Sequence, residues 1–240
     1  MAGGWLLNLY QDAGEAGGCF VSSKPRGSDP GFLSEFDPER SRSEAARRAR
    51  ARLRRYCTAN RLNRLGTLTY AGEGLHDPLR LRKNVGDFFR KLRIGLDSEL
   101  PYVWVPEWHK TGHGLHVHFA VGRYVPRGLI DESWGRGFVH IKLLSDLPVG
   151  SGSLEESRRA AGYLSKYVTK SFVEDERIPG LHRYDVGQGF KPRSIRVHGD
   201  SEQAVISKAS RLMGSPPIKY WSSREVENWK GAPALWLAWA

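Results

Sequence analysis

Cysteine and long apolar runs are scarce in this chain of 240 residues. The two cysteines, Cys19 and Cys57, are too few for the disulfide framework of a small secreted protein. The longest apolar run, ALWLAWA near the end of the sequence, is far shorter than a membrane-spanning helix, and the first residues lack the basic segment of a signal peptide. We therefore expect a cytoplasmic protein that has no membrane partner.

Two further patterns are missing from the sequence. No GxxxxGK[ST] motif occurs, so we expect no nucleotide cofactor and no fused P-loop helicase. No repeat with a period of about 20–50 residues is present, which excludes solenoids and propellers. Hydrophobic residues nevertheless make up 40% of the chain, enough to bury a core. The length suits one domain of ordinary size or one domain with extensions.

Basic residues are abundant and locally concentrated. The chain has 37 Lys and Arg against 26 Asp and Glu, a net charge of +11. Between residues 40 and 64 ten arginines stand against one acid, Glu44. This segment is either a solvated helix face or a helix that contacts phosphates, and the sequence weighs both equally. The candidate DNA-contacting residues are Arg47, Arg48, Arg50, Arg52, Arg54 and Arg55, with Arg90 and Lys91 of a second basic segment.

Periodicity and turn residues predict an α+β fold with a central, mostly antiparallel sheet flanked by helices. The first forty residues are rich in Gly, Pro and Ser, which favours turns and mobile segments. Helices are expected at 41–60, 78–95, 154–172 and around 201–213, and strands at 65–70, 102–109, 115–122 and 137–144.

His116 and His118 lie two residues apart in the strand LHVHFAV, so both imidazoles project from one side of the sheet. If the preceding turn pairs Glu107 with His118 and His109 with His116, all four side chains share that face. Two imidazoles and a carboxylate with open positions are a common metal-binding set. Glu107 is the expected third ligand and His109 a supporting residue, although these two roles can be exchanged. His113 is expected to be a turn residue.

The segment YLSKYVTK carries a second candidate group. On a helix Tyr163 and Tyr167 lie on one face, as do Lys166 and Lys170. Tyrosines at this spacing are most often core residues with solvated hydroxyls. A chemical role requires the phenol to act as a nucleophile, and a nearby ammonium or metal would stabilise the phenolate.

Three motifs together resemble the HUH endonucleases, and the doubled YLSKYVTK is similar to the two-tyrosine initiators of small circular phages and rolling-circle plasmids. LGTLTY (65–70), GLHVHFAV (114–121) and YLSKYVTK (163–170) follow one another in the order of the replication initiators. GRGFVHIK and HRYDVGQGFKPR also resemble replication proteins of actinobacterial plasmids and integrative elements. The resemblance covers about residues 45–175.

The resemblance implies an HUH fold of the RRM or ferredoxin-like kind and a site-specific, single-stranded DNA endonuclease and ligase. This activity would nick a replication origin through a 5′-phosphotyrosine and so start rolling-circle replication. The expected cofactor is Mn²⁺ or Mg²⁺, and the expected partners are single-stranded or hairpin origin DNA with a host helicase and polymerase. The expected domains are a flexible segment (1–40), the nuclease domain (41–175) and an extension packed on it (176–240). The implied metal ligands are His116, His118 and Glu107, the nucleophiles Tyr163 and Tyr167, and the helpers Lys166 and Lys170.

Other functions remain open at this point. A transposase or mobilisation protein would use the same chemistry on different DNA. A non-enzymatic DNA-binding protein accounts for the basic charge but not for the tyrosine and histidine motifs. A hydrolytic zinc enzyme accounts for the ligands but not for the tyrosine helix.

Overall fold

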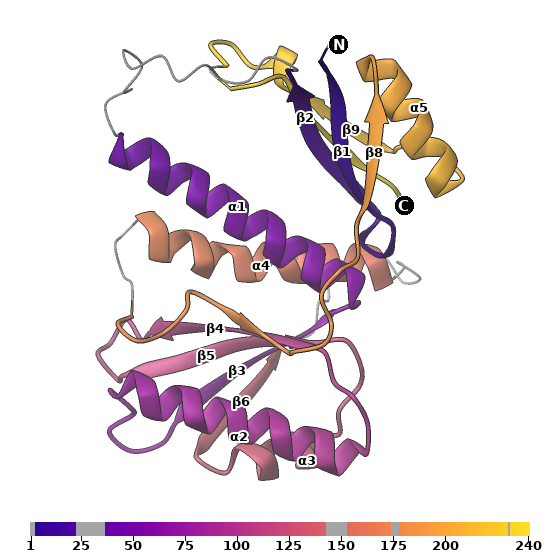
Figure 1. The fold of residues 1–240 in the computed structure, drawn as a ribbon. Coiled ribbons are helices and arrows are strands. Elements are labelled where there is room, and N and C mark those ends of the chain that lie inside the picture. Colours follow the sequence, from indigo (N-terminus) through magenta and orange to yellow (C-terminus); the bar gives the residue numbers. More distant parts are fainter. Residues whose placement is uncertain (1–2, 23–36, 143–152, 174–177, 230) are drawn as a thin grey trace. The chain divides into compact units, whose positions relative to one another are not determined.

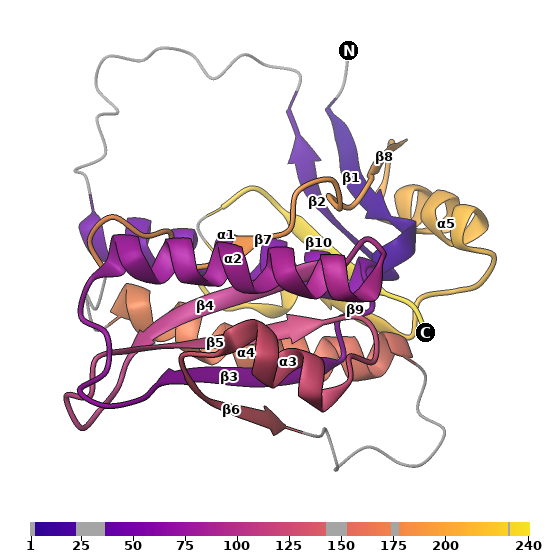
Figure 2. The same ribbon diagram turned by 90° about the horizontal axis from the view of Figure 1, so that it is seen from below.

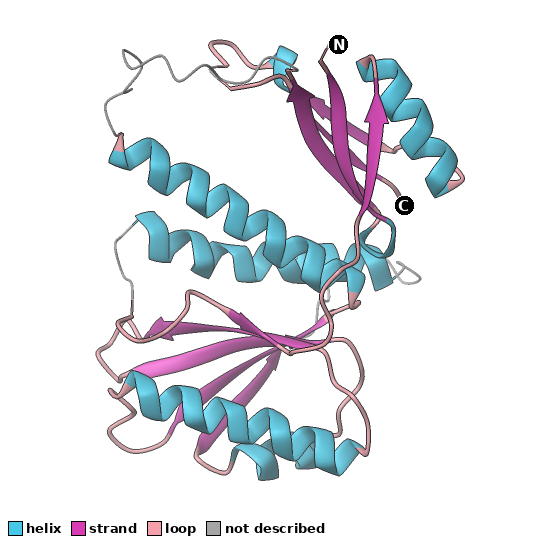
Figure 3. Cartoon of the chain, in the orientation of Figure 1, coloured by secondary structure: helices cyan, strands magenta, loops and turns pink. Residues whose placement is uncertain are grey.

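The computed structural model describes residues 3–22, 37–142, 153–173, 178–229 and 231–240. The chain divides into two compact units, one formed by Met1–Asp37 with Pro192–Ala240 and the other by Pro38–Lys191. Each unit has its own antiparallel sheet, and Figure 3 shows both sheets with their helices. In the described part of the chain, no helix has the length and apolar character needed to cross a membrane.

The unit Pro38–Lys191 is built on a five-stranded sheet with the order β6-β3-β5-β4-β7, in which every neighbouring pair is antiparallel. Alternation along β5 divides its side chains between the two faces. Val117 and Phe119 point into one core, and His116 and His118 point to the opposite face. The strands are β3 (Arg64–Tyr70), β4 (Tyr102–Trp108), β5 (Leu115–Val121), β6 (Gly137–Lys142) and β7 (Asp185–Val186).

Helices cover both faces of this sheet (Figures 1 and 2). The helices α2 (Pro78–Leu96) and α3 (Arg127–Trp134) lie on one face, where Phe88 and Phe89 pack against Phe119. The helices α1 (Pro38–Ala59) and α4 (Ser153–Val173) pack against each other on the other face. The second core, between these helices and the sheet, includes Leu53, Tyr56, Leu65, Val103, Val105, Ala120, Leu164 and Val168.

The sequence determines where α2 begins and ends. The Asp77 side chain accepts hydrogen bonds from the backbone N–H groups of Leu79 and Arg80, and Pro78 occupies the first turn, where its missing N–H costs no helical hydrogen bond. The helix ends at Leu96, and the next residue, Asp97, adopts the left-handed conformation.

The other unit joins the two ends of the chain in one sheet with the order β8-β1-β2-β10-β9. Helix α5 (Glu202–Met213) covers one face of this sheet, and the core between them contains Trp5, Leu7, Leu9 and Trp239. The strands are β1 (Gly4–Tyr10), β2 (Glu15–Val21), β8 (Ile195–Gly199), β9 (Lys219–Ser222) and β10 (Ala234–Ala238), with one-turn helices η1 (Gln11–Ala13) and η2 (Ser223–Glu225).

The structure confirms the α+β fold with antiparallel sheets, but it differs from the predicted organisation in three places. Within the predicted flexible segment 1–40, residues 4–21 form a β-hairpin, because β1 and β2 pair with each other and with the strands β8 and β10 from the end of the chain. Residues 1–2 and 23–36 of that segment lie outside the described residues. The division falls after Lys191 instead of residue 175, since β7 pairs with β4. Helix α3 was not predicted. Residues 143–144 of the predicted strand 137–144 lie outside the described residues.

Candidate active site

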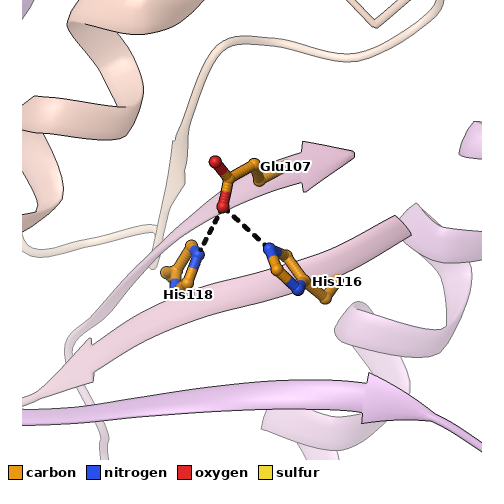
Figure 4. A group of neighbouring side chains, drawn as sticks. All are labelled: Glu107, His116 and His118. Atoms are coloured by element: carbon orange, nitrogen blue, oxygen red, sulfur yellow. Dashed lines mark hydrogen bonds and ion pairs between the residues drawn. The ribbon is translucent and has the colours of Figure 1, made fainter. Parts of the chain in front are cut away.

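The β4–β5 hairpin brings Glu107, His116 and His118 together on the sheet face that carries α4 (Figure 4). Glu107 Oε2 lies 2.8 Å from His116 Nε2 and 2.9 Å from His118 Nε2. The exposed fractions of these side chains are 12% for Glu107, 14% for His116 and 7% for His118. The three residues therefore form a compact, largely buried polar cluster.

The hairpin register differs from the predicted one by two residues. Glu107 stands opposite His116, and His118 stands opposite Val105. Because side chains alternate with a period of two, this difference leaves Glu107 on the predicted face. The prediction that His109 faces His116 is wrong, because β4 ends at Trp108 and the backbone N–H of His109 donates to Gly114 O.

The two remaining histidines of this region direct ring nitrogens to partners outside the cluster. His109 Nδ1 lies 2.6 Å from Thr111 Oγ1, and its ring centroid is 5.2 Å from that of His116. His113, predicted to be a turn residue, lies with Nε2 3.0 Å from the backbone oxygen of Tyr70. Neither imidazole belongs to the three-residue cluster among the described residues.

Electrostatics keep the cluster in a form suited to a cation. Burial raises the pKa of Glu107, but hydrogen bonds from His116 and His118 outweigh this effect and hold the pKa of the carboxyl well below its usual range. Burial lowers the pKa of His118, with Glu107 opposing and His116 adding to the shift. Glu107 is therefore ionised and His118 neutral at pH 7, and these are the forms that bind metals.

Thr67 of β3 is a site residue that the sequence did not reveal. It pairs directly with His118 in the β3–β5 ladder, and its Oγ1 lies 3.1 Å from His118 Nδ1. A hydroxyl can donate to or accept from this nitrogen, so Thr67 holds the imidazole with Nε2 directed at Glu107. The motif LGTLTY contains Thr67, but nothing in the sequence alone indicates which strand lies beside His118.

The donor set fits a divalent cation. One nitrogen from each imidazole and one oxygen from the carboxylate all lie within 4.8 Å of one another. Two imidazoles and a carboxylate suit a transition-metal ion such as Mn²⁺, whereas Mg²⁺ prefers oxygen ligands. The predicted set of His116, His118 and Glu107 is thus brought together, and its chemistry is compatible with a metal ion.

Helix α4 places the two predicted tyrosines against this cluster. The Tyr167 ring stacks on the His118 imidazole, with centroids 3.8 Å apart and an interplanar angle of 18°. The Tyr167 hydroxyl donates a 2.7 Å hydrogen bond to the Tyr163 hydroxyl. Burial raises the pKa of Tyr167, and the hydrogen bond with Tyr163 and the charge of Glu107 raise it further.

The two predicted lysines are placed differently along α4. Lys170 Nζ lies 3.5 Å from Glu107 Oε1, the carboxylate oxygen that does not face the histidines. Lys166 is exposed on the same helix. One ammonium therefore contacts the cluster directly.

The predicted DNA-contacting residues lie on both sides of the sheet. Arg90 and Lys91 are exposed on α2, which covers the face opposite to the cluster, and Arg90 pairs with Asp87. The basic residues of α1 lie on the helix that packs beside α4 on the cluster's face. Of these, Arg47, Arg48, Arg50 and Arg52 are exposed, and Arg54 and Arg55 are half-buried.

The fold and the site together define an α+β domain with a sheet-borne His/His/Glu cluster beneath a helix that carries two tyrosines. The family model described as replication-associated protein ORF2 matches residues 63–172. This stretch runs from the start of β3 to the end of α4 and contains the cluster and both tyrosines. The match confirms the resemblance to replication initiators and supports a role in DNA replication. No curated protein and no solved structure matches the chain.

Proposed function

We propose that the chain is a metal-dependent, strand-specific endonuclease and ligase of the HUH class that nicks single-stranded DNA at a replication origin and starts rolling-circle replication. The observation that carries this proposal is the contact between Tyr167 and His118, with centroids 3.8 Å apart. It sets a pair of hydrogen-bonded phenols directly against a candidate metal site. The family match to replication-associated proteins supports the choice of DNA as the substrate.

His116, His118 and Glu107 would hold the cation. When bound, the cation supplies positive charge that polarises the scissile phosphate and stabilises the charge built up on its oxygens. Thr67 orients His118 from behind, and Lys170 holds the outer oxygen of Glu107. These contacts limit the rotation of two of the three ligands.

The tyrosines perform the covalent step. A phenolate oxygen attacks the phosphorus in line, a Tyr Oη–P bond forms and the bond from phosphorus to the 3′ oxygen breaks. The departing oxygen takes up a proton, which leaves a 5′-phosphotyrosine and a free 3′-OH. Because the energy of the phosphodiester is kept in the phosphotyrosine, the reverse step rejoins DNA without a nucleotide cofactor.

The hydrogen bond between the phenols favours Tyr163 as the first nucleophile. Tyr167 donates to Tyr163, so the Tyr167 proton is engaged in this hydrogen bond and the Tyr163 oxygen accepts it. The raised pKa of Tyr167 keeps that residue protonated and suited to the donor role. We propose that Tyr163 begins the reaction and that Tyr167 attacks in a later round.

The rest of the domain would hold the strand. Exposed arginines of α1 lie on the cluster's face, where they can bind phosphates, and Lys166 extends the basic surface along α4. A single strand or an extruded hairpin is the expected substrate, because the scissile phosphate must enter a site enclosed by the sheet and α4. Unwinding and synthesis are assigned to a host helicase and polymerase.

A denaturing gel tests the proposal. The full chain is incubated with labelled single-stranded DNA tiled across its own replicon, with Mn²⁺ or with chelator. We expect a covalent adduct with Mn²⁺ that disappears in Glu107→Gln and in the double variant Tyr163→Phe/Tyr167→Phe. Tyr124→Phe, which removes the hydroxyl of an exposed tyrosine outside α4, serves as the matched control and keeps full activity.

The single variants test the proposed order. Tyr163→Phe should greatly reduce the first adduct, while Tyr167→Phe should retain it. Equal adduct yields from both would contradict the order but not the nuclease. If no tile gives an adduct while salt-sensitive DNA binding persists, the endonuclease proposal fails and a non-enzymatic DNA-binding protein replaces it.

A further inference from the structure

Phe138 is an exposed aromatic residue on an outer strand of the nuclease unit's sheet. It lies on β6, and 72% of its surface is accessible. Two other side chains of this strand face the opposite way, since Val139 is buried and Ile141 packs against the core under α2 and α3. Packing of Val139 and Ile141 explains why β6 joins the sheet. It does not explain why an aromatic ring stands on the other face of the strand.

The strand register places Phe138 on the same face as the candidate active site. Thr67 pairs with His118 on one side and with His140 on the other, while Thr69 pairs with Phe138. Residues directly opposite in antiparallel strands present their side chains to one face. His140 therefore lies two strand spacings, about 10 Å, from His118 on that face. Only Thr67 stands between them in this row.

This part of the face is left open by the helices that cover the rest. The core beneath α1 and α4 receives side chains from β3, β4 and β5, but within the described ranges it receives none from β6. His140 is exposed, and Thr67 and Thr69 are half-buried. Phe138, His140 and the two threonines thus form an accessible strip that begins at the ligand His118. We refer to these four residues as the β6 strip.

Charge indicates what this strip would bind. Between residues 38 and 191 the chain has 28 Lys and Arg against 17 Asp and Glu, so the whole excess of 11 positive charges belongs to the unit that carries the strip. The other unit is balanced, with nine of each. A basic domain with an exposed aromatic ring beside threonine hydroxyls has the chemistry that binds single-stranded nucleic acid, in which bases stack on the ring and cations hold the phosphates.

We propose that the β6 strip binds the nucleotides next to the scissile phosphate and that Phe138 stacks on one of their bases. This inference rests on the proposed function, because the cluster is what makes the strip a continuation of the cleavage site. Paired bases cannot stack on Phe138, so the strip also provides a physical reason for selecting single strands over duplex DNA.

Binding is measured by fluorescence anisotropy with the full chain in chelator. The probes are a labelled mixed-sequence single strand and the same sequence as a duplex. We expect Phe138→Ala to weaken single-strand binding about tenfold, the size of one base–aromatic contact, and to leave duplex binding unchanged. Phe138→Tyr should restore the wild-type affinity. Because the side chain is exposed, the melting temperature should remain close to that of the wild type.

Two comparisons separate stacking from other causes. Tyr124→Ala removes an aromatic ring that is 68% exposed and lies between β5 and α3, and it should not change affinity. A series of single strands, each lacking one base, should contain a position at which removing the base and replacing Phe138 with Ala no longer have additive effects on the binding free energy. Such a position identifies the stacked base directly.

Each outcome decides between the two proposals. If the wild type forms the tyrosine adduct and Phe138→Ala binds single strands as the wild type does, the proposed role of the β6 strip is contradicted and the endonuclease proposal is supported. If single-strand binding depends on Phe138 but none of the tested strands forms an adduct, the endonuclease proposal is contradicted and the proposed role of the β6 strip is supported. Equal losses of affinity for the single strand and the duplex would overturn the stacking proposal. A change in oligomeric state without a change in DNA affinity would also overturn it, and would indicate that Phe138 contacts another copy of the chain.

Discussion

Thr67 illustrates how a residue outside the candidate ligand set controls it. A neutral imidazole can carry its proton on either nitrogen, and metal binding by Nε2 requires the proton on Nδ1. Thr67 Oγ1 lies 3.1 Å from His118 Nδ1 and can accept that proton's hydrogen bond. The same hydroxyl can donate when no metal is bound. One side chain on the neighbouring strand therefore supports both states of His118.

Replacing Thr67 tests this role. Thr67→Val keeps the shape of the side chain but removes the hydroxyl, and we expect it to weaken Mn²⁺ binding by about 10- to 100-fold. Thr67→Ser retains the hydroxyl and should stay close to the wild-type affinity. Binding is followed by titration calorimetry on the DNA-free protein. Equal affinities for the valine and wild-type chains would show that His118 is oriented by its other contacts, including the stacked ring of Tyr167.

The β4–β5 hairpin is the element that assembles the candidate site, and its turn sets the register. Gly114 has a φ of 88°, and a Cβ there would lie 2.5 Å from the backbone oxygen of Leu75. Only glycine fits this position without strain. The N–H of His109 donates to the oxygen of Gly114, so the turn aligns the strand that carries Glu107 with the strand that carries His116.

Gly114→Ala should therefore destabilise the fold by about 1–3 kcal/mol and also weaken Mn²⁺ binding. Gly86→Ala is the matched control, because it makes the same change inside α2, where a Cβ meets nothing within 4 Å. That variant should be more stable by about 0.5–1 kcal/mol and bind Mn²⁺ as the wild type does. Urea unfolding and metal titration measure the two effects. Normal metal binding by Gly114→Ala would mean that the register does not depend on this turn.

Local patterns predict the elements of the site better than their assembly. The alternation of LHVHFAV indicates which face carries His116 and His118, and the helical spacing of Tyr163 and Tyr167 indicates that they project together. Both predictions depend on neighbouring residues alone. The partnership of Thr67 with His118 and the pairing of β1 with β8 join segments far apart in the chain. Such pairings depend on long-range packing, which residue periodicity does not specify.

The same limit explains the difference at the N-terminus. GEAGG and its neighbours are typical of turns, yet Ala16, Gly17 and Gly18 lie in the middle of β2 between β1 and β10. A Cβ at Gly18 would lie 1.9 Å from the oxygen of Leu6, so the close approach of β1 requires glycine there. A glycine-rich composition reflects backbone contact here instead of mobility.

For the whole molecule, the distribution of charge separates the two units. All of the net positive charge belongs to Pro38–Lys191, and the unit formed by the chain ends is electrically balanced. Binding of a phosphate backbone releases counterions in proportion to the phosphates contacted, so the salt dependence of DNA affinity reports where contacts occur. We expect the salt dependence of DNA affinity to arise from contacts made by the unit Pro38–Lys191.

Neutralising exposed arginines in each unit tests this expectation. Replacing Arg47, Arg48 and Arg50 of α1 with Ala should lower the slope of log affinity against log salt by about 2, since each lost single-strand phosphate contact contributes about 0.7. The same change at the exposed residues Arg193, Arg196 and Arg211 of the other unit should leave the slope unchanged. Binding is measured in chelator over a range of salt concentrations. Equal slopes for the two triple variants would mean that the basic face of α1 is a solvated surface and that the strand is held elsewhere.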